Sequence, residues 1–323
     1  MKIIGLGNAL VDIALRIESD EVLHKVGITK GAMDMIEREK MLSIHTLLQH
    51  IDQRKAPGGA ACNSMRALAH LGHQSGFIGK IGTDSLGDFY EKALADVGVS
   101  PFFVKTNEET GRCTVLVSPC GERTMATYLG PAPTLFPEDI TEEMLSSYDL
   151  IYIEGYLLVN EPLVRSVMQR AKAMGMKVAL DLANFNIVNA FRDLLNDLVP
   201  KYVDILFSNE SEANAFTGLP AEEAVKEIQK MVDISLVTLG KKGILIGHNG
   251  TTSFVPSGGA EPVDTTGAGD NFAAGFLYGL STQASLEKSA RIGAILAEYV
   301  IGVMGPEIPN EQWDKVLKEI NKL

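Results

Sequence analysis

Residues 150–181, LIYIEGYLLVNEPLVRSVMQRAKAMGMKVALD, combine a strand, a helix and a second strand in that order. Residues 150–153 and 177–181 are short runs of mostly apolar, often β-branched side chains, which are typical of strands buried on both faces. Between them, apolar side chains recur at helical spacing, namely Leu163, Val164, Val167, Met168, Ala171 and Met174. This order predicts two parallel strands joined by a helix.

The same alternation extends along the chain. Further apolar runs at residues 2–6, 205–208, 235–239 and 244–247 predict strands, and residues 268–280, 286–300 and 310–323 predict three helices. We therefore expect one α/β domain spanning residues 1–323, with a mostly parallel sheet between two helical layers. Residues 13–36 and 101–128 alternate in polarity and contain turn residues, so we expect them to form a separate antiparallel β lid. Ordinary surface hairpins are the alternative.

Composition excludes several classes of function. The 323 residues carry 29 Lys and Arg against 41 Asp and Glu, a net charge of −12, which disfavours nucleic acids and anionic lipid surfaces as partners. We find neither a signal-peptide pattern nor an apolar run long enough for a membrane span, so we expect a cytoplasmic protein. The three cysteines lack CxxC spacing and the six histidines are scattered, which predicts free thiols and no zinc site.

Two common nucleotide-binding motifs are absent. Residues 5–10, GLGNAL, resemble the start of a dinucleotide fingerprint, but Leu10 stands where the third glycine is needed. The Gly-Lys pairs at 79–80 and 240–241 are followed by Ile81 and Lys242 rather than by Ser or Thr, so neither is a P-loop.

The strongest signal is VDTTGAGDNF at residues 263–272, directly before an apolar helix. Glycines at a helix start leave backbone N–H groups accessible, and the helix dipole favours an anion there. Asp270 at this point could accept a proton beside a transferring phosphoryl group. Capping of the helix by Asp270 is the alternative.

Three further groups are candidates for ligand contact. Residues 57–64, PGGAACNS, place Gly58 and Gly59 before a helix that carries Asn63, although a glycine-rich turn with a structural Asn would have the same sequence. Asn8 and Asp12 follow the first strand; if that strand continues, both lie on one face, and a surface turn is the alternative.

Asn209 and Glu212 form the last group, at the end of the strand at 205–208 and the start of a helix. Acidic and amide side chains in a first helical turn are commonly caps, and that interpretation competes with a ligand-binding role.

Together, Gly58-Gly59 with Asn63, Asn209 with Glu212, and residues 264–270 resemble the ribokinase-like, PfkB-type family of carbohydrate and nucleoside kinases along essentially the whole chain. Residues 5–13 and 202–210 are similar to the adenosine kinase branch. Residues 110–112 and 121–124 are similar to lid segments of sugar and nucleoside kinases alike. The resemblance implies a ribokinase-like three-layer αβα fold with a small β-sheet lid.

The resemblance also implies a role for each position. Asp270 would act as the base, and the N–H groups of Gly267, Ala268 and Gly269 would hold the phosphoryl charge. The sugar would bind to Asn8, Asp12, Gly58, Gly59, Asn63 and Arg123. Mg²⁺ and phosphate would be placed by Asn209 and Glu212 through water. ATP would contact Thr238, Gly240, Lys242 and Ala297. Asp264 and Thr266 would surround a monovalent cation such as K⁺, although residues 299–304 depart from the polar loop expected there.

These implications predict an ATP- and Mg²⁺-dependent kinase that acts on a primary hydroxyl of a ribose-like sugar or a ribonucleoside, as a monomer or a lid-mediated homodimer. A phosphofructokinase-like enzyme would instead need cationic side chains near the sugar, with Arg16, Arg112 and Arg123 as candidates. A sensor without turnover is a further alternative. An adenine slot could use Met33, Met35, Phe102 and Tyr128, which could equally be lid core.

Overall fold

A computed structural model describes residues 1–323 and contains two β-sheets. The larger sheet has nine strands, in the order β14 (Thr251–Pro256), β13 (Gly243–His248), β12 (Ile234–Thr238), β11 (Ile205–Asn209), β10 (Lys177–Asp181), β9 (Leu150–Glu154), β1 (Ile3–Leu6), β5 (Ser75–Gly82) and β6 (Val99–Thr106). Only the pairings of β13 with β12 and β14 are antiparallel. The predicted mostly parallel sheet is confirmed.

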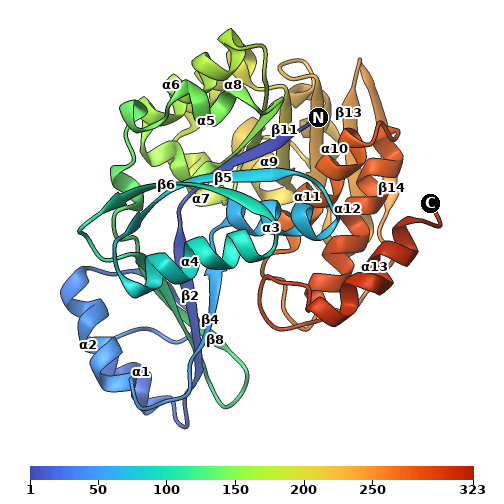
Figure 1. The fold of residues 1–323 in the computed structure, drawn as a ribbon. Coiled ribbons are helices and arrows are strands. Elements are labelled where there is room, and N and C mark those ends of the chain that lie inside the picture. Colours follow the sequence, from blue (N-terminus) through green and yellow to red (C-terminus); the bar gives the residue numbers. More distant parts are fainter.

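Helices cover both faces of this sheet (Figure 1). A core cluster of 40 residues joins one face to α3 (Ala60–His70), α4 (Ser85–Asp96), α11 (Ala268–Ser281), α12 (Leu286–Ile301) and α13 (Trp313–Ile320). A second cluster of 35 residues joins the other face to α5 (Glu142–Ser146), α6 (Glu161–Ala173), α7 (Phe185–Ala190), α8 (Arg192–Tyr202), α9 (Glu210–Thr217) and α10 (Ala221–Ile228). The three-layer αβα prediction is therefore confirmed.

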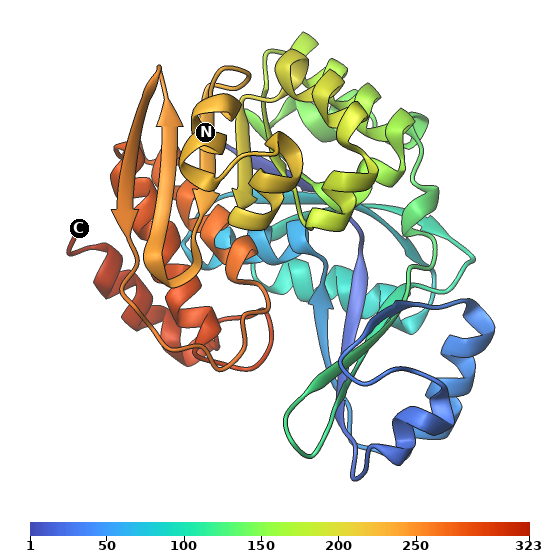
Figure 2. The ribbon, with the colours of Figure 1, turned by 180° about the vertical axis from the view of Figure 1, so that it is seen from behind.

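The smaller sheet has five strands, in the order β3 (Met33–Met35), β8 (Arg123–Tyr128), β7 (Gly111–Val117), β2 (Leu10–Arg16) and β4 (Arg54–Gly58). It projects from the main body together with α1 (Glu21–Val26) and α2 (Arg38–Leu48), as Figure 2 shows from behind. A separate cluster of nine buried residues packs one face of this sheet against the two helices. The opposite face carries Arg123, which contacts Asp264 of the main body.

The sequence prediction for this layer needs three corrections. Val99–Thr106 belongs to the large sheet, where it pairs with β5, so only the later part of 101–128 lies in the small sheet. Strand β4 also belongs to the small sheet and was not predicted. The layer is mixed rather than antiparallel, because β2 pairs parallel to β7 and β3 parallel to β8. No helix combines the length and apolar character needed to cross a bilayer.

Candidate active site

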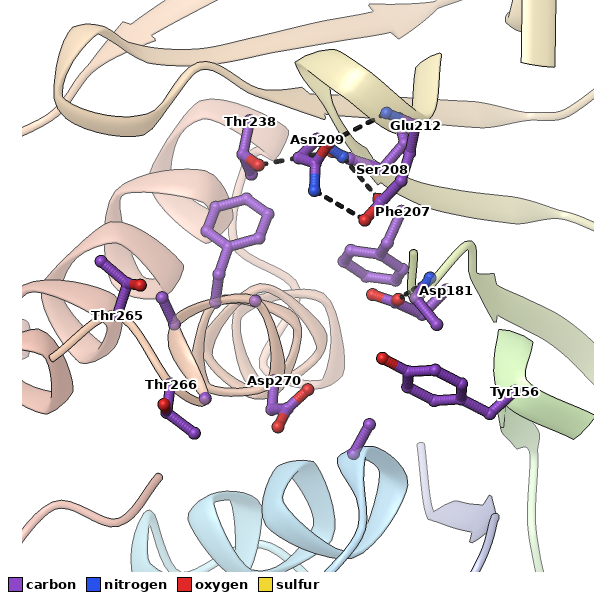
Figure 3. A pocket seen from close by; sticks show the side chains of 16 residues that line it. Tyr156, Asp181, Phe207, Ser208, Asn209, Glu212, Thr238, Thr265, Thr266 and Asp270 are labelled. Atoms are coloured by element: carbon purple, nitrogen blue, oxygen red, sulfur yellow. Dashed lines mark hydrogen bonds between the residues drawn. The ribbon is translucent and has the colours of Figure 1, made fainter. Parts of the chain in front are cut away.

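A central cavity of about 330 Å³ opens at the carboxyl ends of three adjacent parallel strands. Strand β10 ends at Asp181, β11 at Asn209 and β12 at Thr238, and all three residues line the cavity. The start of α11 closes the opposite side, as Figure 3 shows. Ligands of open parallel sheets bind at this edge because the strand ends and helix starts leave backbone groups free there.

The glycine turn, residues 264–270, connects a loop to α11. Gly267 has φ 74° and precedes the first helical residue, and a Cβ at this position would lie 2.7 Å from Pro306 Cα. The N–H groups of Gly267 and Gly269 have no acceptor within the protein, whereas that of Ala268 donates to the Thr265 carbonyl at 3.2 Å. The turn therefore offers the N–H groups of Gly267 and Gly269 to an anion, whereas the N–H group of Ala268 is already hydrogen-bonded.

Asp270 lies in the first turn of α11, and its side chain points into the cavity (Figure 3). Its Oδ2 accepts a 2.8 Å hydrogen bond from Asn63 Nδ2 rather than from a helix N–H group. The Asp270 side chain therefore does not cap α11. Burial raises the pKa of Asp270 to about 8, and the nearby acids Asp181, Glu154 and Asp12 contribute in the same direction.

Asn209 and Glu212 form a reciprocal cap at the start of α9. Asn209 Oδ1 accepts from the Glu212 N–H at 2.9 Å, and the Glu212 carboxylate accepts from the Asn209 N–H and Nδ2 at 2.8 and 2.6 Å. Both residues also line the central cavity, so the capping role and the ligand-facing position coexist. Burial raises the pKa of Glu212, and the charge of Asp181 across the cavity adds to this.

Sequence reasoning missed Asp181 and Glu154. Asp181 lies at the end of a strand that the sequence did predict, and burial raises its pKa. Glu154, at the end of β9, is 1% exposed and accepts from Asn8 N at 2.8 Å, Asn8 Nδ2 at 2.7 Å and Ala61 N at 3.0 Å. The position of each acid at the carboxyl end of a buried strand was the sequence signal that could have identified it.

Asn8 and Asp12 do not extend one strand, because β1 ends at Leu6 and β2 starts a new sheet at Leu10. The two residues still meet the glycine pair. A Cβ on Gly59, where φ is 98°, would lie 2.2 Å from the Asn8 carbonyl oxygen. A Cβ on Gly58 would lie 2.5 Å from Asp12 Oδ1. At Gly59 only glycine permits this approach, because φ is positive and the contact is with backbone, whereas a side chain at Gly58 would displace the Asp12 carboxylate.

Two predicted side chains, those of Asn63 and Arg123, contact the glycine turn from other elements. Asn63 and Ser64 on α3 bond to Asp270, the latter by donating to its backbone carbonyl at 2.9 Å. Arg123 at the start of β8 is bound by Asp264 and Thr266. Burial raises the pKa of Asp12 to about 7, and the charge of Arg123 opposes that rise. The turn therefore touches both α3 and the small sheet.

An apolar cavity of about 370 Å³ adjoins the central one and shares with it Thr238, Thr265, Ala268, Gly269 and Phe272. Gly240 and Ala297 line it, as the resemblance suggested. Lys242 lines neither cavity, whereas the preceding Lys241 lines the apolar one. One cavity is thus rich in polar groups and donors, and its neighbour is apolar.

Metal-binding capacity is limited to pairs of acids. The chain contains no group of three or more His, Cys, Asp and Glu side chains arranged to hold an ion. Asp181 and Glu212 are two carboxylates that line the central cavity; burial raises the pKa of Glu212, and the charge of Asp181 adds to this rise. Such a pair suits Mg²⁺, which commonly takes one or two carboxylates together with water and phosphate oxygens.

Comparisons with known proteins agree with this architecture. Residues 21–313 match the family model described as pfkB family carbohydrate kinase. The adenosine kinase of Saccharomyces cerevisiae is 27% identical and aligns over 96% of this chain and 97% of its own length. The ribokinase of Haemophilus influenzae is 29% identical over 80% of this chain and 85% of its own.

Solved structures of kinases also match this chain. A probable sugar kinase from Rhizobium etli is 31% identical with a TM-score of 0.87, covering 100% of this chain and 99% of that one. The adenosine kinase of Sinorhizobium meliloti is 31% identical with a TM-score of 0.85, covering 98% of each chain. With nearly the whole chain matched in sequence and in fold, this protein belongs to the pfkB family of carbohydrate kinases, which are phosphotransferases that act on hydroxyl groups.

Proposed function

We propose that this enzyme transfers the γ-phosphate of ATP to a primary hydroxyl of a ribonucleoside or a ribose-like sugar. The observation that carries the proposal is the position of Asp270. Its carboxyl is held by Asn63 beside the free N–H groups of Gly267 and Gly269 and is not used as a helix cap. A base and a set of anion donors at one point are what phosphoryl transfer to an alcohol requires.

The two cavities support binding of ATP in an extended pose. The apolar cavity, between Ala297 and Ile244, suits an adenine ring, and the central cavity suits the phosphates. The shared residues Ala268 and Gly269 then lie where the two parts of the nucleotide join. The γ-phosphate would point toward the Asp270 side of the cavity.

The chemistry rests mainly on alignment and charge. Asp270 takes the proton of the attacking hydroxyl, and the turn N–H groups donate hydrogen bonds that stabilise the negative charge developing on the phosphoryl oxygens. Asp181 and Glu212 are the residues that would hold Mg²⁺, directly or through water, with Asn209 orienting Glu212. When bound, the ion neutralises phosphate charge.

The face of the small sheet that meets the main body supports a nucleoside as the substrate. Cross-strand register puts Asp12, Ala14, Val115, Met125 and Met33 on one face, because paired residues point to the same side. Asp12 can bind sugar hydroxyls at one end of this face, and the apolar side chains beside it can hold a base.

The other residues considered for a base slot do not join this face. Phe102 lies in the large sheet and packs against Tyr148. Tyr128 pairs with Arg112 on the opposite face of the small sheet. Of the four candidates, only Met33 and Met35 remain, 60% and 61% exposed on the edge strand β3. The same exposed edge supports pairing with a second copy if the enzyme is a dimer.

A second candidate, a kinase of phosphorylated sugars, is supported by one observation. Arg16 and Arg54 line, together with Asp52, a cavity of about 480 Å³ on the face of the small sheet that carries Ala14 and Val115. Arg112 lies buried near Glu109 on the far face, and Arg123 is paired with Asp264, so neither is free for a substrate phosphate.

The test compares kcat/KM for adenosine, ribose and fructose 6-phosphate with labelled ATP. The nucleoside assignment expects adenosine to be preferred. In the double variant Arg16→Met, Arg54→Met, adenosine turnover should change far less than turnover of fructose 6-phosphate, because adenosine carries no phosphate for the two arginines to bind. A loss of about tenfold or more confined to the phosphosugar would establish the second candidate. Lys55→Met, on the opposite face of β4, is the matched charge control. Binding without transfer for every compound would show a sensor and reject the kinase proposal.

A further inference from the structure

One hydrogen-bond network connects the small sheet to the glycine turn. Arg123, the first residue of β8, donates from Nη1 to Asp264 Oδ2 at 2.5 Å and to Thr266 Oγ1 at 2.6 Å. Asp264 and Thr266 stand at the start of the turn that ends in Asp270. The side chains of Arg123 and Asp264 are only 16% and 9% exposed. This is a shielded ion pair between residues 141 positions apart.

The carboxylate of Asp264 is fully used. It accepts from Thr266 N at 3.0 Å and Thr266 Oγ1 at 2.7 Å through Oδ1, and from Gly305 N at 2.8 Å and Arg123 through Oδ2. A carboxylate has about four lone-pair sites, so no site remains for another cation. Burial opposes ionisation, but the hydrogen bonds of Gly305 and Thr266 and the charge of Arg123 lower the pKa of Asp264.

A monovalent cation at Asp264 and Thr266 therefore does not fit this chain. The oxygen atoms that would bind it already hold a guanidinium, and the following segment brings the Gly305 N–H group, a donor, to the same carboxylate. We propose that Arg123 is a built-in cation that takes the place of a monovalent ion beside the glycine turn, and that it positions the turn for phosphoryl transfer. The proposal rests on the kinase assignment.

The position of Arg123 explains why it affects the turn. Thr266 directly precedes Gly267, whose backbone is also confined by Pro306. With Arg123 in place, Asp264 holds both Thr266 and Gly305, so the turn is fixed on two sides. Without it, a buried carboxylate would lose its counter-charge and the Thr266 hydroxyl would lose a donor. Arg123 acts through the turn and is a positioning residue.

The main test uses the wild-type enzyme in buffers with K⁺, Na⁺ or tetramethylammonium at equal ionic strength. We expect the same kcat and the same Tm in all three. Activation by K⁺ of more than about threefold, or a Tm rise in K⁺ of more than about 2 °C, would show a functional ion site and overturn the proposal.

The second test removes the guanidinium. Arg123→Met should lower kcat by about 10- to 100-fold with a smaller effect on KM for ATP, because the turn loses its alignment. Added K⁺ or guanidinium should then restore part of the turnover and raise Tm, since the vacated oxygens bind a cation. Arg123→Lys should retain more activity than Arg123→Met. Arg38→Met, which breaks the exposed Arg38–Glu109 pair, is the control.

The outcomes separate the inference from the kinase assignment. A wild-type enzyme without turnover on any substrate rejects the assignment, while the Tm comparison in different salts still tests the ion site. An Arg123→Met variant that folds, as judged by circular dichroism, and keeps wild-type kcat rejects the positioning role. A variant with low kcat and neither rescue by cations nor a salt-dependent Tm also rejects it, because the loss would then be purely structural.

Discussion

Replacing Asp270 with asparagine tests the proposed base at constant shape. The new amide oxygen can still accept from Asn63 Nδ2, so the hydrogen bond at 2.8 Å and the turn should persist. The amide cannot take a proton from the substrate, and general base catalysis is typically worth ~10²–10⁴ in rate. We expect kcat to fall by more than ~10³ while the affinity for ATP changes little.

The same substitution should stabilise the fold near neutral pH. Burial raises the pKa of Asp270 from 3.8 to about 8, so at pH 7 the folded protein must hold a proton that the unfolded chain releases. About three pKa units separate 3.8 from pH 7, and each is worth about 1.4 kcal/mol, giving an upper limit of about 4 kcal/mol. Neighbouring acids that share the protons reduce this, and we expect a gain of at least about 1 kcal/mol, or about 2 °C in Tm.

The assay combines two measurements on one preparation. Single-turnover kinetics with saturating substrates report the chemical step, and thermal unfolding between pH 4 and pH 8.5 reports stability. The gain should be largest at pH 8 and vanish near pH 4, because a raised folded-state pKa removes stability only as pH rises. Asp314→Asn, an exposed acid in the first turn of α13, is the control. Turnover near the wild-type rate, or no gain in stability at pH 8, would refute the reasoning.

Three further outcomes follow from the same geometry. The kcat/KM of the wild-type enzyme should rise with pH up to about pH 8, because free Asp270 must be ionised to act as a base; a flat profile from pH 6 to 9 would contradict this. Glu212→Gln should raise the Mg²⁺ concentration for half-maximal activity by about tenfold, measured by titration at fixed ATP, whereas an unchanged requirement would remove Glu212 from the ion site. Ala297→Phe should fill part of the apolar cavity and raise KM for ATP by at least about tenfold with little change in kcat; unchanged KM would place the adenine elsewhere.

The large sheet was predictable because its central strands are buried on both faces. Runs such as residues 150–153 are apolar throughout. A short run of this kind is typical of a strand that is buried on both faces of a sheet. The strand β6 was misplaced because it is the edge strand of the sheet and its side chains are mostly half-buried. The sequence of an edge strand therefore resembles that of a strand in a small sheet with one solvent-exposed face.

The glycine turn and the Asn209 cap were found from the sequence because the residues of each are close together in the chain. Their residues lie within a few positions, so a helix start and its polar groups can be identified together. The partners of Glu154 and of Arg123 could not be found in this way. Glu154 is bound by Asn8, 146 positions away, and Arg123 meets Asp264 across 141 positions. Only the fold brings such groups together: the strand-end position of Glu154 marks it as a candidate acid, but neither Glu154 nor Arg123 has a local sequence feature that identifies its partner.

The pKa of Asp270 depends partly on acids at two strand ends of the large sheet. After burial, the negative charges of Asp181 and Glu154 are among the causes of its raised pKa, and these residues end β10 and β9. Glu154→Gln keeps an oxygen for Asn8 but removes one charge above about pH 7, where Glu154 ionises. The pKa of Asp270 should then fall, since a like charge has been removed.

The expected result is a kcat/KM profile whose rise occurs at lower pH in Glu154→Gln than in the wild type. A loss of structure alone would lower the plateau without moving the midpoint. If the midpoint stays fixed while the plateau is retained, the two carboxyl groups are not coupled through their charges. In that case burial against α3 and α11, rather than the acids at the strand ends, would set the protonation of the base.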